Sequence, residues 1–214
     1  MKLIEQGTNW VIIDNISDNL IKFTKEIISD ADPTDFSDRT TAKGSVQNYL
    51  KNTIWLDKKI KEPKRWKELD TKFVEITRQL LVHYCKMPHT WGDIEISSAW
   101  TVTGKDKSFH TLHSHNEQHI VSVIYLDVPK KEKNYEGQIN LILDANGYSN
   151  LGLPKHRILQ IDPYPGLMLI FPGWILHSVN PQGPGTRQTV NIDFSGILIP
   201  GEYASMTTTL SSTY

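Results

Sequence analysis

The sequence predicts a mainly β protein with α-helices (α+β), in which a double-stranded β-helix (jelly roll) is buttressed by N-terminal helices. Three observations lead to this fold class. Two segments with apolar residues at helical spacing come first, six segments typical of strands follow, and Gly, Pro and Asn residues separate those six. Because the helices precede the strands and do not alternate with them, a parallel sheet of βαβ units is not expected.

The first expected helix spans residues 17–29. Leu20 and Ile27 lie on one side of it, seven residues apart, which is two helical turns. The Ser17 hydroxyl can cap the helix N-terminus, and Pro33 follows shortly after the end. This segment therefore carries a start signal, an apolar face and a stop signal.

The second expected helix spans residues 63–86. Pro63 suits its first turn and Pro88 ends it. Its apolar face is made of residues that recur at steps of three and four: Trp66, Leu69, Phe73, Ile76, Leu80 and Tyr84. The stretch Asp35–Asn52 between the two helices is polar and rich in turn-forming residues, and we interpret it as a connection or lid.

After Trp91 the spacing of apolar residues changes to two, which is the period of a strand. Turn-forming residues bound each of these segments, as expected for an antiparallel jelly roll. The six expected strands are residues 93–103, 119–128, 137–143, 157–161, 166–171 and 187–194.

A chain of 214 residues is long enough for one domain with a sizeable core. We expect a single domain over residues 1–214. Within it, residues 1–90 form a helical N-terminal part that packs on the barrel, residues 91–200 form the jelly-roll catalytic core, and residues 201–214 form a flexible tail of mostly Ser and Thr.

Composition excludes several classes of partner. The formal net charge is −1, from 23 basic and 24 acidic residues, so no basic excess points to nucleic acid. No apolar run approaches the roughly 20 residues of a membrane span, and the N-terminus lacks the apolar region of a signal peptide. The single cysteine, Cys85, fits a reducing compartment and a core thiol. We expect a cytoplasmic protein; the sequence carries no signal for its oligomeric state.

Histidines cluster before the second expected strand. Four of the eight in the chain, His110, His113, His115 and His119, lie within ten residues. Positions i and i+2 of an extended chain face the same way, so His113 and His115 can present two imidazoles to one ion. Neutral imidazole is a ligand for Fe, Zn, Cu and Ni.

A third ligand is expected from a distant strand. His177 follows the almost wholly apolar strand 166–171, at the loop or at the start of the next short segment. Three protein ligands leave coordination positions open, as a catalytic metal requires. Glu117 offers a competing set, in which His115, Glu117 and His177 make two histidines and one carboxylate.

Four motifs carry a resemblance to a known family. They are His113-Ser-His115, VSVIYLDVP, PGLMLIFPGWILHSV and Arg187-Gln-Thr189, in the order in which the chain presents them. In these motifs the chain resembles the 2-oxoglutarate/Fe(II)-dependent dioxygenase superfamily, and within it a phage and bacterial oxygenase group akin to prolyl hydroxylases. The resemblance covers roughly residues 95 to 196.

The resemblance implies roles for the residues that match. His113 and His177 would ligate Fe(II), and position 115 would hold the second ligand. Most of the superfamily has Asp or Glu there, whereas this chain has His115, so either three histidines bind or the register slides to Glu117. We prefer the three histidines, because Phe109–His113 resembles the strand that enters the metal pair.

The implied co-substrate is 2-oxoglutarate, used with O2. Arg187 would pair with its distal carboxylate, since a guanidinium makes planar, bidentate hydrogen bonds to a carboxylate. Thr189 lies on the same strand face and Tyr125 on a neighbouring strand, and both hydroxyls could bind the same carboxylate. The implied activity is hydroxylation of an unidentified small-molecule or peptidyl substrate, with succinate and CO2 as co-products.

Two other functions remain open from the sequence. A cupin-like metal-dependent enzyme that does not use 2-oxoglutarate would fit the spacing of Gly166, Pro172 and His177, but it leaves Arg187 without a role. A non-catalytic jelly-roll binding protein would use the clustered histidines for recognition that depends on pH. Turnover of 2-oxoglutarate in the presence of metal separates the dioxygenase from both.

Overall fold

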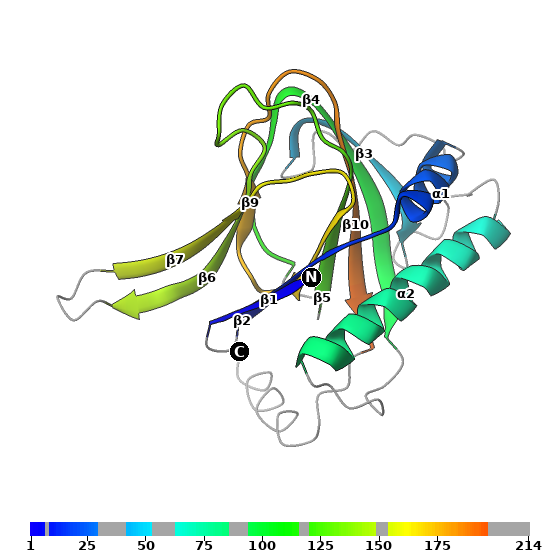
Figure 1. The fold of residues 1–214 in the computed structure, drawn as a ribbon, viewed down its shortest axis with the longest axis horizontal. Coiled ribbons are helices and arrows are strands. Elements are labelled where there is room, and N and C mark those ends of the chain that lie inside the picture. The colour runs from blue at the N-terminus through cyan, green and yellow to red at the C-terminus, as the bar shows by residue number, and fades with distance from the viewer. Residues whose placement is uncertain are drawn as a thin grey trace, which may run out of the picture.

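The computed structural model describes residues 1–6, 9–29, 42–52, 63–85, 94–115, 120–148 and 154–196. Within these ranges there are two helices, α1 (Asp18–Ser29) and α2 (Pro63–Cys85), and ten strands (Figure 1). The strands are β1 (Lys2–Gln6), β2 (Asn9–Asn15), β3 (Ala42–Asn52), β4 (Glu95–His113), β5 (Ile120–Asp127), β6 (Ile139–Tyr148), β7 (Pro154–Ile161), β8 (Leu167–Pro172), β9 (His177–Val179) and β10 (Arg187–Ser195).

The strands form one curled antiparallel sheet. Its order is β1-β2-β8-β5-β10-β4-β9-β6-β7, and β3 pairs with β4 outside this path. Strands that are neighbours in the sheet are distant in the chain, as β5 shows by lying between β8 and β10. This interleaving is typical of a jelly roll, so the predicted fold class is confirmed.

Strand alternation divides the core into two apolar clusters. On β5, Ile124 and Leu126 belong to the outer cluster beneath the helices, whereas Val123 and Tyr125 belong to the cluster inside the barrel. The same division runs along β8, which is buried on both faces. Central strands covered on both faces are expected to be continuously apolar, and this is why 166–171 has little visible period.

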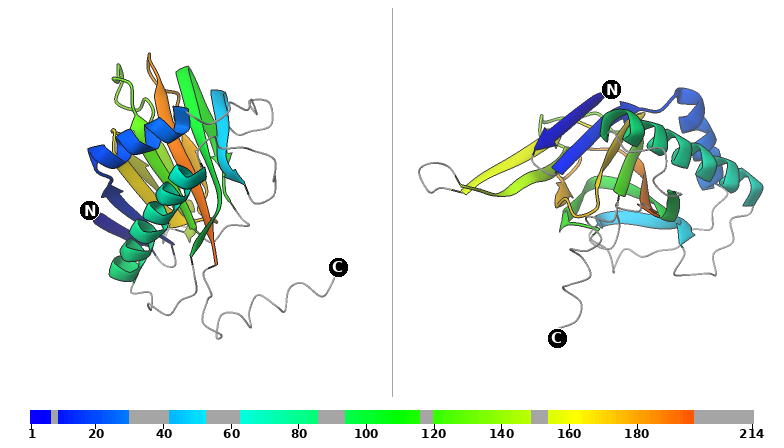
Figure 2. Two further views of the ribbon diagram at one scale, coloured as in Figure 1. Left: turned by 90° about the vertical axis from the view of Figure 1, so that its right-hand side faces the viewer. Right: turned by 90° about the horizontal axis from the view of Figure 1, so that it is seen from below.

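The two helices cover one face of the sheet (Figure 2). Leu69 and Phe73 of α2 and Ile27 of α1 are buried in the outer cluster, which also contains residues of β5, β8 and β10. Cys85, the last residue of α2, packs against this cluster, and burial together with the charge of Glu5 raises the pKa of its thiol to about 11. The thiol is therefore protonated at neutral pH, as expected of a core residue.

β4 reaches both sides of the barrel because it bends near Gly104. Its first part pairs with β10, and its last residues pair with β9. The buried side chain of Gln182 makes three hydrogen bonds at this bend. Its amide donates to the carbonyls of Gly104 and Gly185, and its oxygen accepts from Ser108 Oγ at 2.8 Å. These hydrogen bonds join the connection between β9 and β10 to β4 at the point where the pairing of β4 passes from β10 to β9.

The N-terminal part of the chain contains strands where the sequence analysis expects only helices. β2 pairs with β8 at one side of the sheet, and β1 pairs with β2. Residues 42–52, interpreted above as a connection or lid, form β3 on β4. The boundary expected at residue 90 and the tail expected at 201–214 lie outside the described residues. No helix in the described part of the chain is long and apolar enough to cross a membrane.

The hydrogen bonds of Gln182 lead to a prediction about stability. Gln182→Leu keeps the size of the side chain but leaves the Ser108 hydroxyl and the Gly104 carbonyl without this partner. A buried polar group left unpaired costs about 1–3 kcal/mol, so we expect a loss of that order in the free energy of unfolding, measured by urea denaturation. The matched control is Gln160→Leu, at an exposed amide of β7, with an expected change within about 0.5 kcal/mol. Equal losses in the two variants would contradict the assigned role of Gln182.

Candidate metal centre

Three histidines converge where β4 ends and β9 begins. His113 is the last residue of β4, His177 is the first of β9, and the two are direct partners in the antiparallel ladder. His115 follows His113 at the same strand end. One ring nitrogen from each histidine can be chosen so that all three lie within 4.8 Å of one another. The structure thus brings together the three residues of the preferred sequence prediction.

Hydrogen bonds fix which nitrogen of each ring is free. Nδ1 of His113 lies 2.7 Å from the Thr111 carbonyl oxygen, and Nδ1 of His177 lies 3.0 Å from the Ile175 carbonyl oxygen. Nδ1 of His115 lies 2.7 Å from Asp193 Oδ1. Carbonyl and carboxylate oxygens only accept, so each Nδ1 carries the proton and each Nε2 keeps its lone pair. Three such Nε2 atoms are a suitable donor set for Fe or Zn.

His115 is also held from the side. The Trp100 indole, on β4, stacks on its imidazole with ring centroids 5.7 Å apart and an interplanar angle of 21°. The side chains of His115 and Asp193 are 12% and 9% exposed. Stacking and the carboxylate contact therefore leave this ring little rotational freedom.

Burial favours the neutral form of two of these imidazoles, those of His177 and His113. It lowers the pKa of His177 to about 3, and the neighbouring His113 lowers it further than burial alone would. The pKa of His113 is also lowered, again mainly by burial, although the hydrogen bond to Thr111 opposes this shift. A neutral imidazole is the form that binds a metal, so these rings need not release a proton first.

A buried arginine lies in the same barrel. Arg187 opens β10 and is 2% exposed, and its two terminal nitrogens Nη1 and Nη2 have no hydrogen-bond partner among the described residues. Burial lowers the pKa of Arg187, and the nearby Tyr125 opposes that shift. Burying a charged group without a partner is costly, so an unpaired guanidinium here calls for an anion that is bound during function.

The other two residues predicted for the co-substrate lie beside Arg187. Thr189 and Tyr125 are paired across β10 and β5, and both are buried. Burial raises the pKa of Tyr125 to about 12, while the charge of Arg187 acts in the opposite direction. The Thr189 hydroxyl accepts a hydrogen bond from Asn191 at 3.2 Å. Two hydroxyls and a guanidinium therefore face one region of the interior.

His110 connects the two halves of the site. Burial lowers its pKa well below the usual value, and the charge of Arg187 is the next cause, followed by His113, His177 and His115. Its ring centroid lies 6.0 Å from that of His113. His110 is thus within electrostatic reach of both the guanidinium and the three histidines, so the two features belong to one interior space.

Two residues of the sequence analysis cannot be placed: Glu117 and His119 lie outside the described residues. Asp193 is the residue that sequence reasoning missed. A signal for it exists, because alternation from Arg187 and Thr189 puts Asn191 and Asp193 on the same face of β10. All four are buried, while Val190, Ile192 and Phe194 on the opposite face join the outer apolar cluster.

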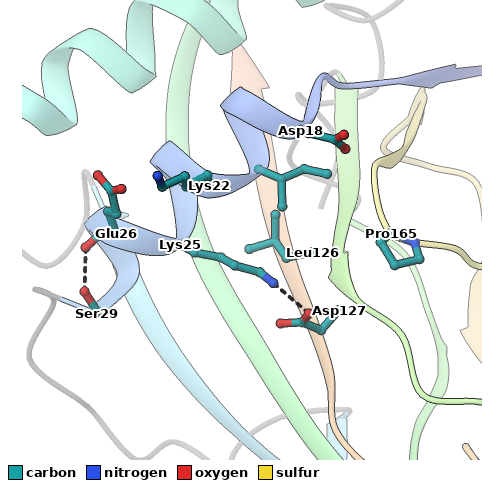
Figure 3. A pocket seen from close by; sticks show the side chains of 9 residues that line it. Asp18, Lys22, Lys25, Glu26, Ser29, Leu126, Asp127 and Pro165 are labelled. Atoms are coloured by element: carbon teal, nitrogen blue, oxygen red, sulfur yellow. Dashed lines mark hydrogen bonds and ion pairs between the residues drawn. The ribbon is translucent and has the colours of Figure 1, made fainter.

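A separate groove of about 610 Å³ lies between α1 and the end of β5 (Figure 3). The half-exposed pair Lys25 and Asp127 meets across it at 2.6 Å. Its lining residues include none of the three histidines and not Arg187. An exposed ion pair of this kind contributes little stability, and the groove is not part of the metal centre.

Residues 98–193 match the model of a protein family described as "Putative 2OG-Fe(II) oxygenase". This span begins in β4 and ends at Asp193, and it includes the three histidines and Arg187. No curated protein matches the sequence.

Solved structures share the fold. A Pseudomonas putida prolyl-4-hydroxylase has a TM-score of 0.55 at 13% identity, covering 87% of this chain and 92% of its own. A Trichoplax adhaerens prolyl hydroxylase, in complex with a hypoxia inducible factor peptide fragment, has a TM-score of 0.57 at 14% identity, covering 96% and 89%. HygX from Streptomyces hygroscopicus, with nickel and 2-oxoglutarate bound, has a TM-score of 0.57 at 9% identity, covering 86% and 82%.

The lowered histidine pKa values predict how the metal-free protein responds to acid. The pKa of His177 is about 3 in the folded state and about 6.5 in the unfolded chain, so only the unfolded chain takes up a proton between these values. The stability contributed by the neutral ring is present above pH 6.5 and is lost as the pH falls towards 3. Between pH 7.5 and 5.5 we expect His177 alone to account for a loss of about 1.4 kcal/mol, measured by urea denaturation with a chelator present.

His177→Asn keeps a donor for the Ile175 carbonyl but cannot titrate, so its stability should fall less steeply between these two pH values. The control is His83→Asn, at an exposed position of α2, which should fall as steeply as the wild type. An unchanged slope in His177→Asn would contradict the buried, neutral state of this ring.

Proposed function

We propose that the protein is a 2-oxoglutarate- and Fe(II)-dependent dioxygenase that hydroxylates a small-molecule or peptidyl substrate, and the match of residues 98–193 to the family model supports this proposal. An enzyme of this kind uses Fe(II), 2-oxoglutarate and O2, and releases succinate and CO2. The observation that carries the proposal is the buried guanidinium of Arg187, with two unpartnered nitrogens, inside a barrel where three imidazoles converge. A metal site alone would fit many enzymes, whereas this combination fits a metal with a carboxylate-bearing co-substrate.

His113, His115 and His177 would hold the iron through Nε2, since each Nδ1 is occupied by an acceptor. When bound, Fe(II) with 2-oxoglutarate and O2 supplies the oxidising power that replaces a substrate C–H bond by C–OH. Three protein ligands leave the remaining positions for the co-substrate and O2. The Nδ1 hydrogen bonds hold the rings in their ligating orientation before the metal arrives.

Arg187 would bind the distal carboxylate of 2-oxoglutarate in bidentate fashion. Tyr125 and Thr189 are paired across β5 and β10, and the charge of Arg187 acts on the Tyr125 phenol, so both hydroxyls would donate hydrogen bonds to the same carboxylate. Because the pKa of Tyr125 is raised to about 12, its phenol is protonated at neutral pH and acts as a donor. A charged pair formed in this dry interior is stronger than the same pair in water.

Apolar residues around the histidines would exclude water from the reaction. Phe171 contacts His177 edge to face, with ring centroids 5.1 Å apart. Leu141 pairs with His177 across β6 and β9 and is fully buried in the interior cluster. A dry site protects reactive species from side reactions with solvent, and it is the protein's part in cofactor chemistry of this kind.

The substrate class follows from the relatives only in broad terms. Two of the similar structures are named as prolyl hydroxylases, one of them bound to a peptide fragment, and HygX is a further 2-oxoglutarate-binding relative. They support a peptidyl or small-molecule substrate for this chain as well.

Anaerobic titration with Fe(II) and 2-oxoglutarate tests whether Arg187 binds the distal carboxylate of 2-oxoglutarate. We expect a visible charge-transfer band in the wild type. Arg187→Ala should bind Fe(II) normally but need about 30-fold or more additional 2-oxoglutarate, because losing one partner of a buried charged pair costs about 2–5 kcal/mol. The control is Arg78→Ala, at an exposed position of α2. If Arg187→Ala needed no more 2-oxoglutarate than the wild type, Arg187 would not be the residue that binds the distal carboxylate.

The same titration decides between the two ligand sets. His177→Ala should give a weak or absent band, since it removes a ligand common to both sets. Glu117→Gln should load iron fully if the three histidines are the ligands. Loss of iron in Glu117→Gln would instead favour the set of His115, Glu117 and His177.

A further inference from the structure

The second ligand position of this chain carries a histidine where the superfamily mostly has a carboxylate. A carboxylate is nevertheless present one hydrogen bond further from the metal position: Asp193 Oδ1 lies 2.7 Å from His115 Nδ1. We infer that Asp193 is a positioning residue that gives His115 the negative charge which a ligating Asp or Glu would supply. This inference rests on the proposed function.

Asp193 is built into the sheet so that its carboxylate points at His115. Ser98 Oγ donates to Asp193 Oδ2 at 3.1 Å, and Ser97 Oγ donates to the Asp193 carbonyl at 3.0 Å. The register between β10 and β4 shifts directly after Asp193, at the step to Phe194. Such irregularities re-aim side chains near functional sites. With both carboxylate oxygens occupied, the side chain has one orientation.

His115 differs from the other two histidines in what holds it. His113 and His177 donate to backbone carbonyls, which are neutral, whereas His115 donates to a carboxylate. A carboxylate partner makes an imidazole a more basic ligand, and such outer partners influence metal affinity by about 10- to 100-fold. His115 is therefore expected to be the strongest nitrogen donor of the three.

Charge balance in the interior gives the same answer independently. Among the described residues, Arg187 and Asp193 are the buried side chains that carry a permanent charge. In the proposed loaded site, the charges of Fe(II) and the 2-oxoglutarate dianion cancel each other, so the positive charge of Arg187 leaves the site one negative charge short of neutrality. Three neutral histidines cannot provide it, and Asp193 does. An uncompensated buried charge is costly, so this single carboxylate makes the loaded site electrically neutral.

The test measures the affinity of metal-free protein for Co²⁺ alone by calorimetry, together with the absorption of the bound Co²⁺. Asp193→Asn is the key variant, because an amide keeps an acceptor for His115 and lets Ser98 accept in place of donating, so only the charge is lost. We expect about 10-fold weaker binding in Asp193→Asn and a loss closer to 100-fold in Asp193→Ala. Bound Co²⁺ should also absorb at shifted wavelengths, which a purely structural role of Asp193 would not cause.

Ser97→Ala is the matched control. It removes a hydrogen bond to the Asp193 backbone but leaves the carboxylate and its contact with His115 in place. We expect wild-type affinity for Co²⁺. A loss as large as that of Asp193→Asn would mean that the affinity reports local folding, and it would overturn the inference.

Adding Asp193→Asn to a second variant, His115→Asp, separates the effect of the Asp193 charge on Co²⁺ affinity from an effect on local structure. In His115→Asp the charge moves onto the ligand itself and faces the carboxylate of Asp193, so adding Asp193→Asn should leave Co²⁺ binding unchanged or strengthen it. The inference is wrong if Asp193→Asn weakens Co²⁺ binding equally in the wild type and in His115→Asp. It is also wrong if the single variant Asp193→Asn binds Co²⁺ as tightly as the wild type. Failure of the wild-type protein to bind Co²⁺ or Fe(II) at all would instead overturn the proposed function.

Discussion

Two opposite charges buried on one face of one strand are the constraint around which this barrel is arranged. Arg187 and Asp193 both point inward from β10, while the alternate residues of the same strand pack under the helices. Such a strand is stable only if its outer face is well covered and its inner charges find partners. α1 and α2 provide the cover, and His115 provides the partner for Asp193. Arg187 is left for a ligand.

The rest of the architecture brings imidazoles to the inner face of that strand. β4 pairs with β10 along its first part, bends where Gln182 is hydrogen-bonded to it, and then pairs with β9. Along this path β4 leads from its pairing with β10 to the start of β9, where His113 and His115 lie beside His177. The buried amide of Gln182 satisfies polar groups of β4 on both sides of this bend, at Gly104 and at Ser108.

Much of this could be predicted from the sequence, because it depends on local periodicity. The two helices, six of the strands and the approach of His113 to His115 follow from spacing, and the resemblance named the distant His177 and Arg187. β1, β2, β3 and the short β9 were missed. β3 is polar in sequence and lies outside the main path of the sheet. Asp193 was missed for another reason: alternation places it on the inner face, but its contact with His115 depends on the register between β10 and the end of β4, which only tertiary structure fixes.

The features that a stable core would avoid are the ones gathered in this interior. Arg187 has two buried nitrogens without partners among the described residues, and the imidazoles of His113, His115 and His177 lie close together. A buried, unpaired guanidinium opposes folding, and under the proposed function the 2-oxoglutarate dianion would supply its partner. A site organised in this way binds its ligands with little rearrangement, because the side chains are already oriented by Asp193, Trp100 and the strand carbonyls. Departures from good packing are thus concentrated where chemistry requires them, and the two apolar clusters compensate for them elsewhere.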